Sequence, residues 1–145
     1  MKKVILFLVL VTAIGLLSFS IFAVKKSTTA TIKNNTFSID IAKSQSQQEI
    51  GLAKYQKLEQ NMAMYFPFDH ADYFVFWMKD MHFPMDIIFI ENGKIVTIYN
   101  DVKPEKDYQD FIYKPTAPSN AVLEINAGLS RKYGFRTGDN VIISY

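Results

Sequence analysis

The sequence predicts a mainly β fold: a small antiparallel β-sandwich or barrel with one or two short helical turns, preceded by an N-terminal hydrophobic helix. Three observations support this prediction. Apolar and polar residues alternate with the period of a β-strand, as at Phe37, Ile39 and Ile41. Turn residues, above all Asn92-Gly93, separate the apolar stretches. An uncharged run of 21 residues lies near the start of the chain, at 4–24.

The N-terminal run reads VILFLVLVTAIGLLSFSIFAV and is flanked by lysines at positions 2, 3, 25 and 26. As a helix it would be about 31 Å long, which is enough to cross the hydrocarbon core of a bilayer. We therefore expect residues 1–26 to be a signal-anchor helix, and residues 4–24 to be the contact with the membrane. A signal peptide cleaved near Ala23 is the alternative. In either case the rest of the chain is expected outside the cytoplasmic membrane, anchored or secreted.

Composition excludes several classes of function. Of the 16 Lys and Arg residues, 12 lie beyond residue 26, where they face 14 acidic residues. This slightly acidic balance lacks the positive surface of a nucleic-acid binder. The chain has no cysteine, which excludes disulfides, thiolate metal sites and a cysteine nucleophile. It also lacks a phosphate-binding glycine loop, so a nucleotide is not expected as a partner. Together with the charge balance, this means that we expect neither nucleic acid nor nucleotide.

The first elements follow a short linker at 27–30, which opens a single β domain at 31–145. Alternation around Asn34-Asn35 predicts a hairpin near 30–42. Residues 44–58 then change character. Ser44 followed by Gln47 fits a capping box, so a short helix or turn is expected there.

From Met62 the chain is rich in β-branched and aromatic residues. Asn92-Gly93 predicts a hairpin between strands at 86–91 and 94–99, and Pro84 should end the preceding strand. The remaining expected elements are a long loop at 101–118, a strand at 120–126, a helical turn at 129–133 ended by Gly134, a turn at 137–139 and a last strand at 140–145.

Several phrases together resemble one known family. They are QEIGL at 48–52, NMAMYF at 61–66, FWMKDMHFPMDIIFI at 76–90, LEINAG at 123–128 and GDNV at 138–141. In this order they are similar to the family called domain of unknown function 192, over about residues 31–144. The resemblance implies a small β-sandwich with a short helical segment, and it implies no established activity. Many relatives carry paired cysteines in the loop that matches 101–118, and this chain has none.

Polar residues in two of these phrases form the candidate binding site. They are Trp77, Lys79, Asp86, Glu124 and Asn126. Buried polar groups cost free energy unless they satisfy one another or share an open site. We therefore expect Lys79, Asp86 and Glu124 to lie close together near one end of the sheet. The structural alternative is that Asp86 pairs with Lys79 and caps the turn at Phe83-Pro84.

Two other groups of residues could bind ligands. Thioether and imidazole side chains suit Cu(I) and gather within 24 residues: Met62, Met64, Met78, Met81, Met85 and His82. Methionine is also a common core filler, so copper binding is the weaker hypothesis. The loop at 101–118 carries Tyr108, Phe111 and Tyr113, which either bind a ligand or hold the loop on the sheet.

These observations predict an exported or membrane-tethered β domain with a binding or accessory role in the cell envelope, and a glycan or peptide as its ligand. The alternative from another class is an envelope enzyme, a glycan-directed hydrolase that uses Asp86, Glu124 and Lys79. The sequence assigns no catalytic residue, metal ligand or cofactor beyond these candidates.

Overall fold

The computed structural model describes residues 27–104 and 112–145. In chain order the elements are β1 (Thr29–Ile32), β2 (Asn35–Ile41), α2 (Gln45–Ile50), the 3₁₀ helix η1 (Gly51–Lys54), β3 (Met62–Asp72), β4 (Phe76–Trp77), β5 (Met85–Glu91), β6 (Lys94–Val102), β7 (Ile112–Tyr113), β8 (Ser119–Asn126), α3 (Leu129–Tyr133) and β9 (Val141–Ser144). Within these residues the fold is mainly β with two short α-helices, as predicted. The hydrophobic helix expected at 4–24 lies outside the described residues.

Within the described ranges, none of the helices is long and apolar enough to cross a bilayer.

Seven strands form one sheet in the order β6-β5-β8-β3-β2-β1-β9, and β4 pairs with β7 in a small second sheet. The prediction of an antiparallel sheet is wrong for one pair, because β2 and β3 run parallel. The chain between them passes through α2 and η1. Such a crossover carries the chain back to the end of the sheet at which β2 began, so that β3 can run in the same direction.

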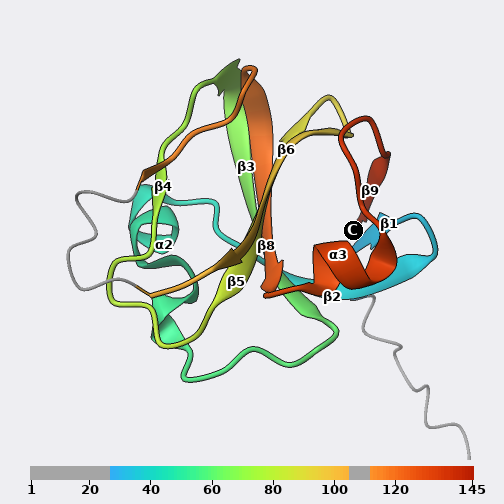
Figure 1. The fold of residues 1–145 in the computed structure, drawn as a ribbon. Helices are drawn as coiled ribbons and strands as arrows, with labels where there is room; N and C mark the ends of the chain where they lie inside the picture. The colour runs from blue at the N-terminus through green and yellow to red at the C-terminus, as the bar shows by residue number, and fades with distance from the viewer. Residues whose placement is uncertain (1–26, 105–111) are drawn as a thin grey trace, which may run out of the picture.

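The seven-stranded sheet curls until its two edge strands, β6 and β9, meet at one end (Figure 1). There the backbone N–H of Ile95 donates to the carbonyl of Asp139 at 3.0 Å, and the N–H of Val141 donates to the carbonyl of Gly93 at 2.8 Å. A bridge between Lys94 and Asn140 completes the junction. The sheet is therefore a curled half-barrel with an inner and an outer face.

Each face of the sheet carries its own core, because side chains alternate along every strand. The residues of the inner core are Ala30, Ile32, Phe37, Ala63, Ile88, Ile90, Ile95, Ala121, Leu123, Ile125, Leu129, Phe135 and Val141. The residues of the outer core are Ala42, Leu52, Leu58, Met64, Phe66, Met78, Met85, Ile87, Phe89, Val102 and Val122. Strand β5 contributes to both cores, which explains why its apolar run is nearly continuous.

Local turn signals account for most element boundaries. Asn92 (φ 49°) and Gly93 (φ 72°) form a two-residue turn between β5 and β6, which confirms the predicted hairpin. Gly134 ends α3 in the left-handed conformation, as expected. In the first hairpin the left-handed residue is Lys33 (φ 53°), and Asn35 already belongs to β2, so the turn lies one residue earlier than predicted.

The expected linker at 27–30 is also shorter than predicted, because β1 begins at Thr29 and pairs with both β2 and β9. The capping box before α2 is confirmed. The Ser44 side chain accepts a hydrogen bond from the backbone of Gln47, and the Gln47 side chain accepts one from the backbone of Ser44.

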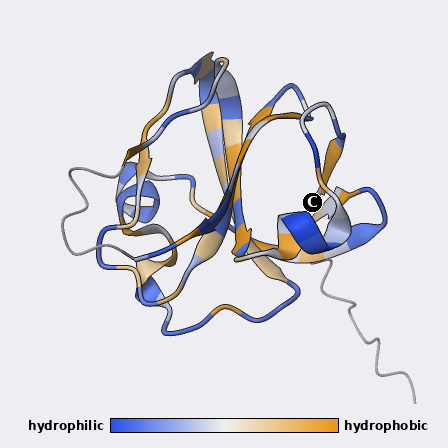
Figure 2. Cartoon of the chain, in the orientation of Figure 1, coloured by the Kyte–Doolittle hydropathy of each residue, from blue (hydrophilic) through white to orange (hydrophobic). Residues whose placement is uncertain are grey.

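The covering layer, formed by α2, η1 and the β4–β7 pair, lies over the outer face of the sheet (Figure 1). Helix α2 has no buried residue and appears hydrophilic in Figure 2. Polar contacts therefore hold it in place: Gln48 Nε2 donates to the carbonyls of Ala42 and Pro67 at 3.3 and 3.2 Å. At the end of η1, Lys54 Nζ lies 2.7 Å from Asp40 Oδ2 on β2.

Candidate functional site

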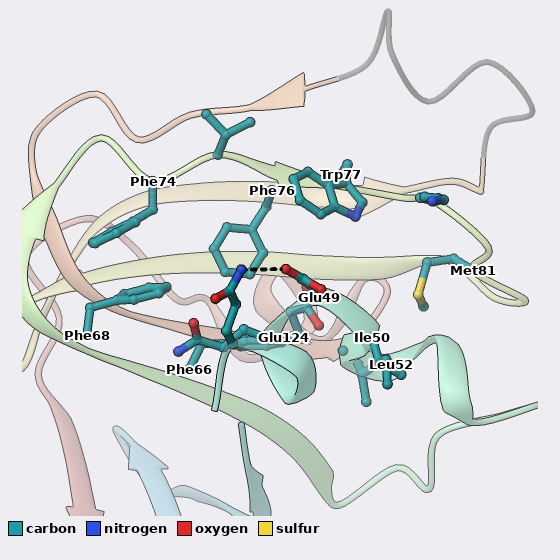
Figure 3. A pocket seen from close by; sticks show the side chains of 15 residues that line it. Glu49, Ile50, Leu52, Phe66, Phe68, Phe74, Phe76, Trp77, Met81 and Glu124 are labelled. Atoms are coloured by element: carbon teal, nitrogen blue, oxygen red, sulfur yellow. Dashed lines mark hydrogen bonds between the residues drawn. The ribbon is translucent and has the colours of Figure 1, made fainter. Parts of the chain in front are cut away.

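A cavity of about 260 Å³ lies between the outer face of the sheet and the covering layer (Figure 3). Strands β3 and β8 form its sheet side, and α2, η1 and the chain around β4 form the other side. The lining residues are Gln45, Gln48, Glu49, Ile50, Gly51, Leu52, Phe66, Phe68, Phe74, Val75, Phe76, Trp77, Lys79, Met81 and Glu124. The wall is mainly aromatic and aliphatic, with a few polar groups among them.

Four phenylalanines build the aromatic wall, at alternate positions of two chain segments that face each other. Phe66 and Phe76 meet edge to face, with ring centroids 5.1 Å apart. Phe68 and Phe74 stack with centroids 3.7 Å apart. Because the rings pack on one another, the wall is held in one shape. Trp77 continues it to the rim, where 40% of the residue stays exposed.

Glu124 brings a carboxyl group into this apolar environment. On β8 it is paired with Met64 of β3 and Ile87 of β5, so uncharged neighbours flank it on both sides. Only 5% of the residue is exposed, and its Oε2 atom has no hydrogen-bond partner among the described residues. Burial raises the pKa of the Glu124 carboxyl to about 8. Near neutral pH the group is therefore mostly protonated and can donate a hydrogen bond.

Two charged residues, Glu49 and Lys79, also line the cavity, and both are exposed. Glu49 Oε1 accepts a hydrogen bond from Gln45 Nε2 at 2.8 Å, drawn as a dashed line in Figure 3. The view places Glu49 opposite the rings of Phe76 and Trp77. The cavity thus combines one buried carboxyl group with polar side chains at its opening.

Asp86 does not belong to this site, although the sequence predicted that it would. It pairs with Ile125 on β8, whereas Glu124 pairs with Ile87, so the two carboxyl groups lie on opposite faces of the sheet. Asp86 is fully buried and accepts hydrogen bonds from the backbone N–H groups of Asp101, Gly128 and Ser130, each at 2.8 Å. It caps the start of α3 instead of the turn at Phe83-Pro84.

Asn126 is also outside the cavity, although it lies on the same face of β8 as Glu124. Its Nδ2 atom donates to the carbonyls of Leu58 and Glu59 at 3.1 and 3.0 Å. These contacts hold the segment that leads into β3. Of the five predicted site residues, the structure therefore brings together Trp77, Lys79 and Glu124, and gives Asp86 and Asn126 structural roles.

Sequence reasoning missed the phenylalanines of the wall and Glu49. The phenylalanines had a signal, since Phe66 and Phe68 alternate on one strand and Phe74 and Phe76 on the next segment. Glu49 had none, because only the parallel crossover places α2 over the outer face of the sheet.

The methionines of the copper hypothesis belong to the packing of the outer core. Met64, Met78 and Met85 are buried in it, and Met62 and Met81 pack against it. In the aromatic loop, Tyr113 lies on β7, pairs with Phe76, and its ring contacts Tyr99 at 5.1 Å. Tyr108 and Phe111 lie outside the described residues. Tyr113 therefore holds the β4–β7 pair of the covering layer against β6 of the seven-stranded sheet.

The fold and the site define a class: a small domain with a curled, mixed β-sheet and an aromatic cavity on its outer face that contains a buried carboxyl group. The chain belongs to the family called domain of unknown function 192 (DUF192), described as uncharacterized ACR, which it matches over residues 27–143. This confirms the resemblance seen in FWMKDMHFPMDIIFI and LEINAG.

Two solved structures share the fold. A protein of unknown function from Novosphingobium aromaticivorans is 29% identical, with a TM-score of 0.71 over 80% of this chain and 83% of that one. A protein from Sinorhizobium meliloti, whose description proposes a transcription regulator, is 27% identical, with a TM-score of 0.71 over 81% of this chain and 94% of that one. No protein with a curated functional description matches the chain.

Proposed function

We propose that this chain is an exported, membrane-tethered ligand-binding protein of the cell envelope, and that the cavity at Glu124 holds its ligand. The anchor in this proposal is the apolar run at 4–24. One observation carries the binding role: Glu124 Oε2 is buried in a preformed aromatic cavity and lacks a partner among the described residues. An unpaired buried polar atom costs free energy. A ligand that forms a hydrogen bond with this atom removes the cost, which contributes to the free energy of binding.

The size of the cavity limits the bound group. A cavity of roughly 150 Å³ accepts benzene. The 260 Å³ here therefore accommodates one ring with a substituent, such as a single sugar unit or amino-acid side chain. The exposed ring of Trp77 at the rim offers a flat apolar face for the same purpose. A larger glycan or peptide would insert one residue and extend beyond the opening.

Glycans and peptides are the ligands that this proposal favours, because both occur in the envelope and both present ring-sized units. A role in binding DNA has less support. Beyond residue 26 the chain has 12 basic and 14 acidic residues, and nucleic-acid binding depends on a positive surface. The regulator role proposed for the S. meliloti protein is therefore not carried over.

A thermal-shift screen of the full chain in lipid nanodiscs tests the proposal. The probes are N-acetylglucosamine, a disaccharide fragment of peptidoglycan and the free stem peptide of peptidoglycan. A ligand that binds the native state raises the unfolding midpoint by mass action. We expect one probe to raise it for the wild type and not for Phe74→Ala, which opens the wall. Exposed Ile142→Ala is the control and should respond like the wild type. A screen without any shift would contradict the proposal.

The second candidate is a glycan-directed hydrolase, which one observation favours. Glycosidases use two carboxyl groups at one site, one of them with a raised pKa. Glu124, with its pKa raised to about 8 by burial, and the exposed Glu49 line the same cavity. Asp86 does not take part, because it lies on the opposite face of the sheet from Glu124. Hydrolysis of a chromogenic N-acetylglucosaminide that is lost in both Glu49→Gln and Glu124→Gln would support this candidate, and absence of turnover would remove it.

A further inference from the structure

We infer that the ligand presents an uncharged hydrogen-bond acceptor of the amide-carbonyl class to the cavity, and that Glu124 binds it as a protonated carboxyl donor. The inference rests on the proposed function and specifies the chemistry that the cavity recognises. Amide carbonyl groups of this kind occur in N-acetylated sugars and in peptides.

The surroundings of Glu124 determine its role as a donor. Its strand neighbours on the same face are Met64 of β3 and Ile87 of β5, both fully buried. On the cavity side, Phe66 and Phe76 complete an apolar shell. Such a shell gives no compensation for a buried negative charge, so the neutral carboxyl group is favoured.

Charged groups from the covering layer do not change this conclusion. The titratable residues that share the cavity are Glu49 from α2 and Lys79, which follows β4, and both are exposed. The cavity residues from β3 and η1 carry no charge. Burial is the cause that raises the pKa of Glu124 to about 8, above any working pH near neutrality.

Ligand chemistry follows from a neutral donor in apolar walls. A carbonyl oxygen accepts the proton of the carboxyl group, while the ring attached to it fills the aromatic space. A carboxylate ligand next to Glu124 would have to bury its charge among Met64, Ile87 and the phenylalanine rings, because Lys79 is an exposed residue of the cavity. An ammonium ligand would need Glu124 in its ionised form, and the proton would have to leave first. Neutral acceptors are therefore selected over ions of the same size.

Affinity should also depend on pH, because only the protonated form donates. At pH 6.5 nearly all molecules are competent to bind. At pH 9.5 a group with a pKa of about 8 is protonated in roughly one molecule in thirty, so the apparent affinity falls about thirtyfold.

The test uses Trp77, the single tryptophan of the chain, which lines the cavity and reports on occupancy through its fluorescence. The full chain in nanodiscs is titrated at pH 6.5 with three probes of one size: benzamide, benzoate and benzylamine. We expect benzamide to bind at least tenfold more tightly than either ion. Its affinity should fall about thirtyfold at pH 9.5.

Three variants separate the roles of the carboxyl groups. Glu124→Gln keeps a neutral donor and should retain benzamide binding at both pH values. Glu124→Leu removes the donor and should weaken benzamide at least tenfold, with thermal unfolding showing that it is folded. Glu59→Gln makes the same change at an exposed carboxyl group outside the cavity and should keep both the affinity and the pH dependence of the wild type.

Two kinds of failure are distinguishable. Benzamide binding that is unchanged in Glu124→Leu, or benzylamine binding more tightly than benzamide at pH 6.5, would overturn the inference and leave the cavity as a binding site. If none of the three probes changes the emission of Trp77, the cavity is not a site for ring-sized groups, and the proposed function is overturned with the inference.

If benzamide binds as expected, two further probes distinguish the sources of the carbonyl. N-acetylglucosamine and N-acetylphenylalanine amide carry the same amide group on a sugar and on an amino acid. Tighter binding of the first assigns the site to N-acetylated glycans, and tighter binding of the second assigns it to peptides. Equal and Glu124-independent binding of both would contradict the donor role.

Discussion

Asp86 and Glu124 lie on neighbouring strands, one register position apart, and point to opposite faces of the same sheet. On the inner face, Asp86 accepts three backbone hydrogen bonds of 2.8 Å. On the outer face, Glu124 has one oxygen without any partner in the described part of the chain. The same functional group thus stabilises the fold in one position, while in the other it keeps a buried oxygen without a partner among the described residues.

Replacing Asp86 should destabilise the domain strongly. Asp86→Ala leaves the buried N–H group of Ser130 and the partly buried N–H groups of Asp101 and Gly128 without acceptors, and we expect a loss of about 3 kcal/mol or more in the free energy of unfolding. Urea unfolding measures it. Asp69→Ala, at an exposed position of β3, is the control and should stay within about 0.5 kcal/mol of wild type. Equal stability of the two variants would contradict the capping role of Asp86.

The stability of the wild type should fall as pH rises from about 5 to 8. Burial raises the pKa of Glu124 from 4.5 to about 8, so the folded state binds a proton that the unfolded state has already lost. The contribution is complete below pH 4.5 and lost as pH passes 8, and it amounts to about 5 kcal/mol.

Glu124→Gln is the matched variant for this pH dependence, because it cannot ionise. Urea unfolding at pH 5 and pH 8.5 should give a smaller decrease for the variant than for the wild type. At pH 8.5 we expect the variant to be the more stable protein. Parallel curves for the two proteins would show that Glu124 ionises normally in the folded state.

The β5–β6 turn depends on the positive φ angles of Asn92 and Gly93. A Cβ atom at Gly93 would lie 3.3 Å from the carbonyl oxygen of Val141, where the two edge strands meet. Gly93→Val should therefore cost about 1–2 kcal/mol or more, from backbone strain and from this contact. Asn92→Gly keeps the positive φ and serves as the control. A melting temperature of Gly93→Val equal to that of the control would refute the turn's importance.

The proposed membrane tether is tested by determining the topology of the chain in the membrane. We expect residues 27–145 to lie outside the cytoplasmic membrane and to stay attached to it, because residues 4–24 are long enough to span. Cell fractionation followed by protease digestion from outside should find the domain in the membrane fraction and accessible. Recovery in the cytoplasm would contradict export. Recovery as a soluble species outside would favour cleavage near Ala23.

Local signals made the elements of the fold predictable. The Asn92-Gly93 turn, the Ser44–Gln47 capping box and Gly134 at the end of α3 each act over a few residues, and the structure contains all three. The parallel pairing of β2 with β3 was not predictable, because it depends on where the crossover through α2 packs.

The candidate site was predictable only in part, for a related reason. Strand alternation places Glu124 on the opposite face of its strand from Leu123 and Ile125. It does not fix the register of β5 against β8. A shift of one residue would have put Asp86 beside Glu124. The register that the structure adopts places Ile87 there instead.

Titration of the Glu124 carboxyl group tests directly whether this group binds a ligand in its protonated form. Carboxyl ¹³C shifts of the full chain, assigned with Glu124→Gln, give the pKa of this group with and without benzamide. We expect a midpoint near 8 for the protein alone, and a higher midpoint when a neutral acceptor binds the protonated form. A midpoint near 4.5, or one that saturating benzamide leaves unchanged, would contradict this expectation.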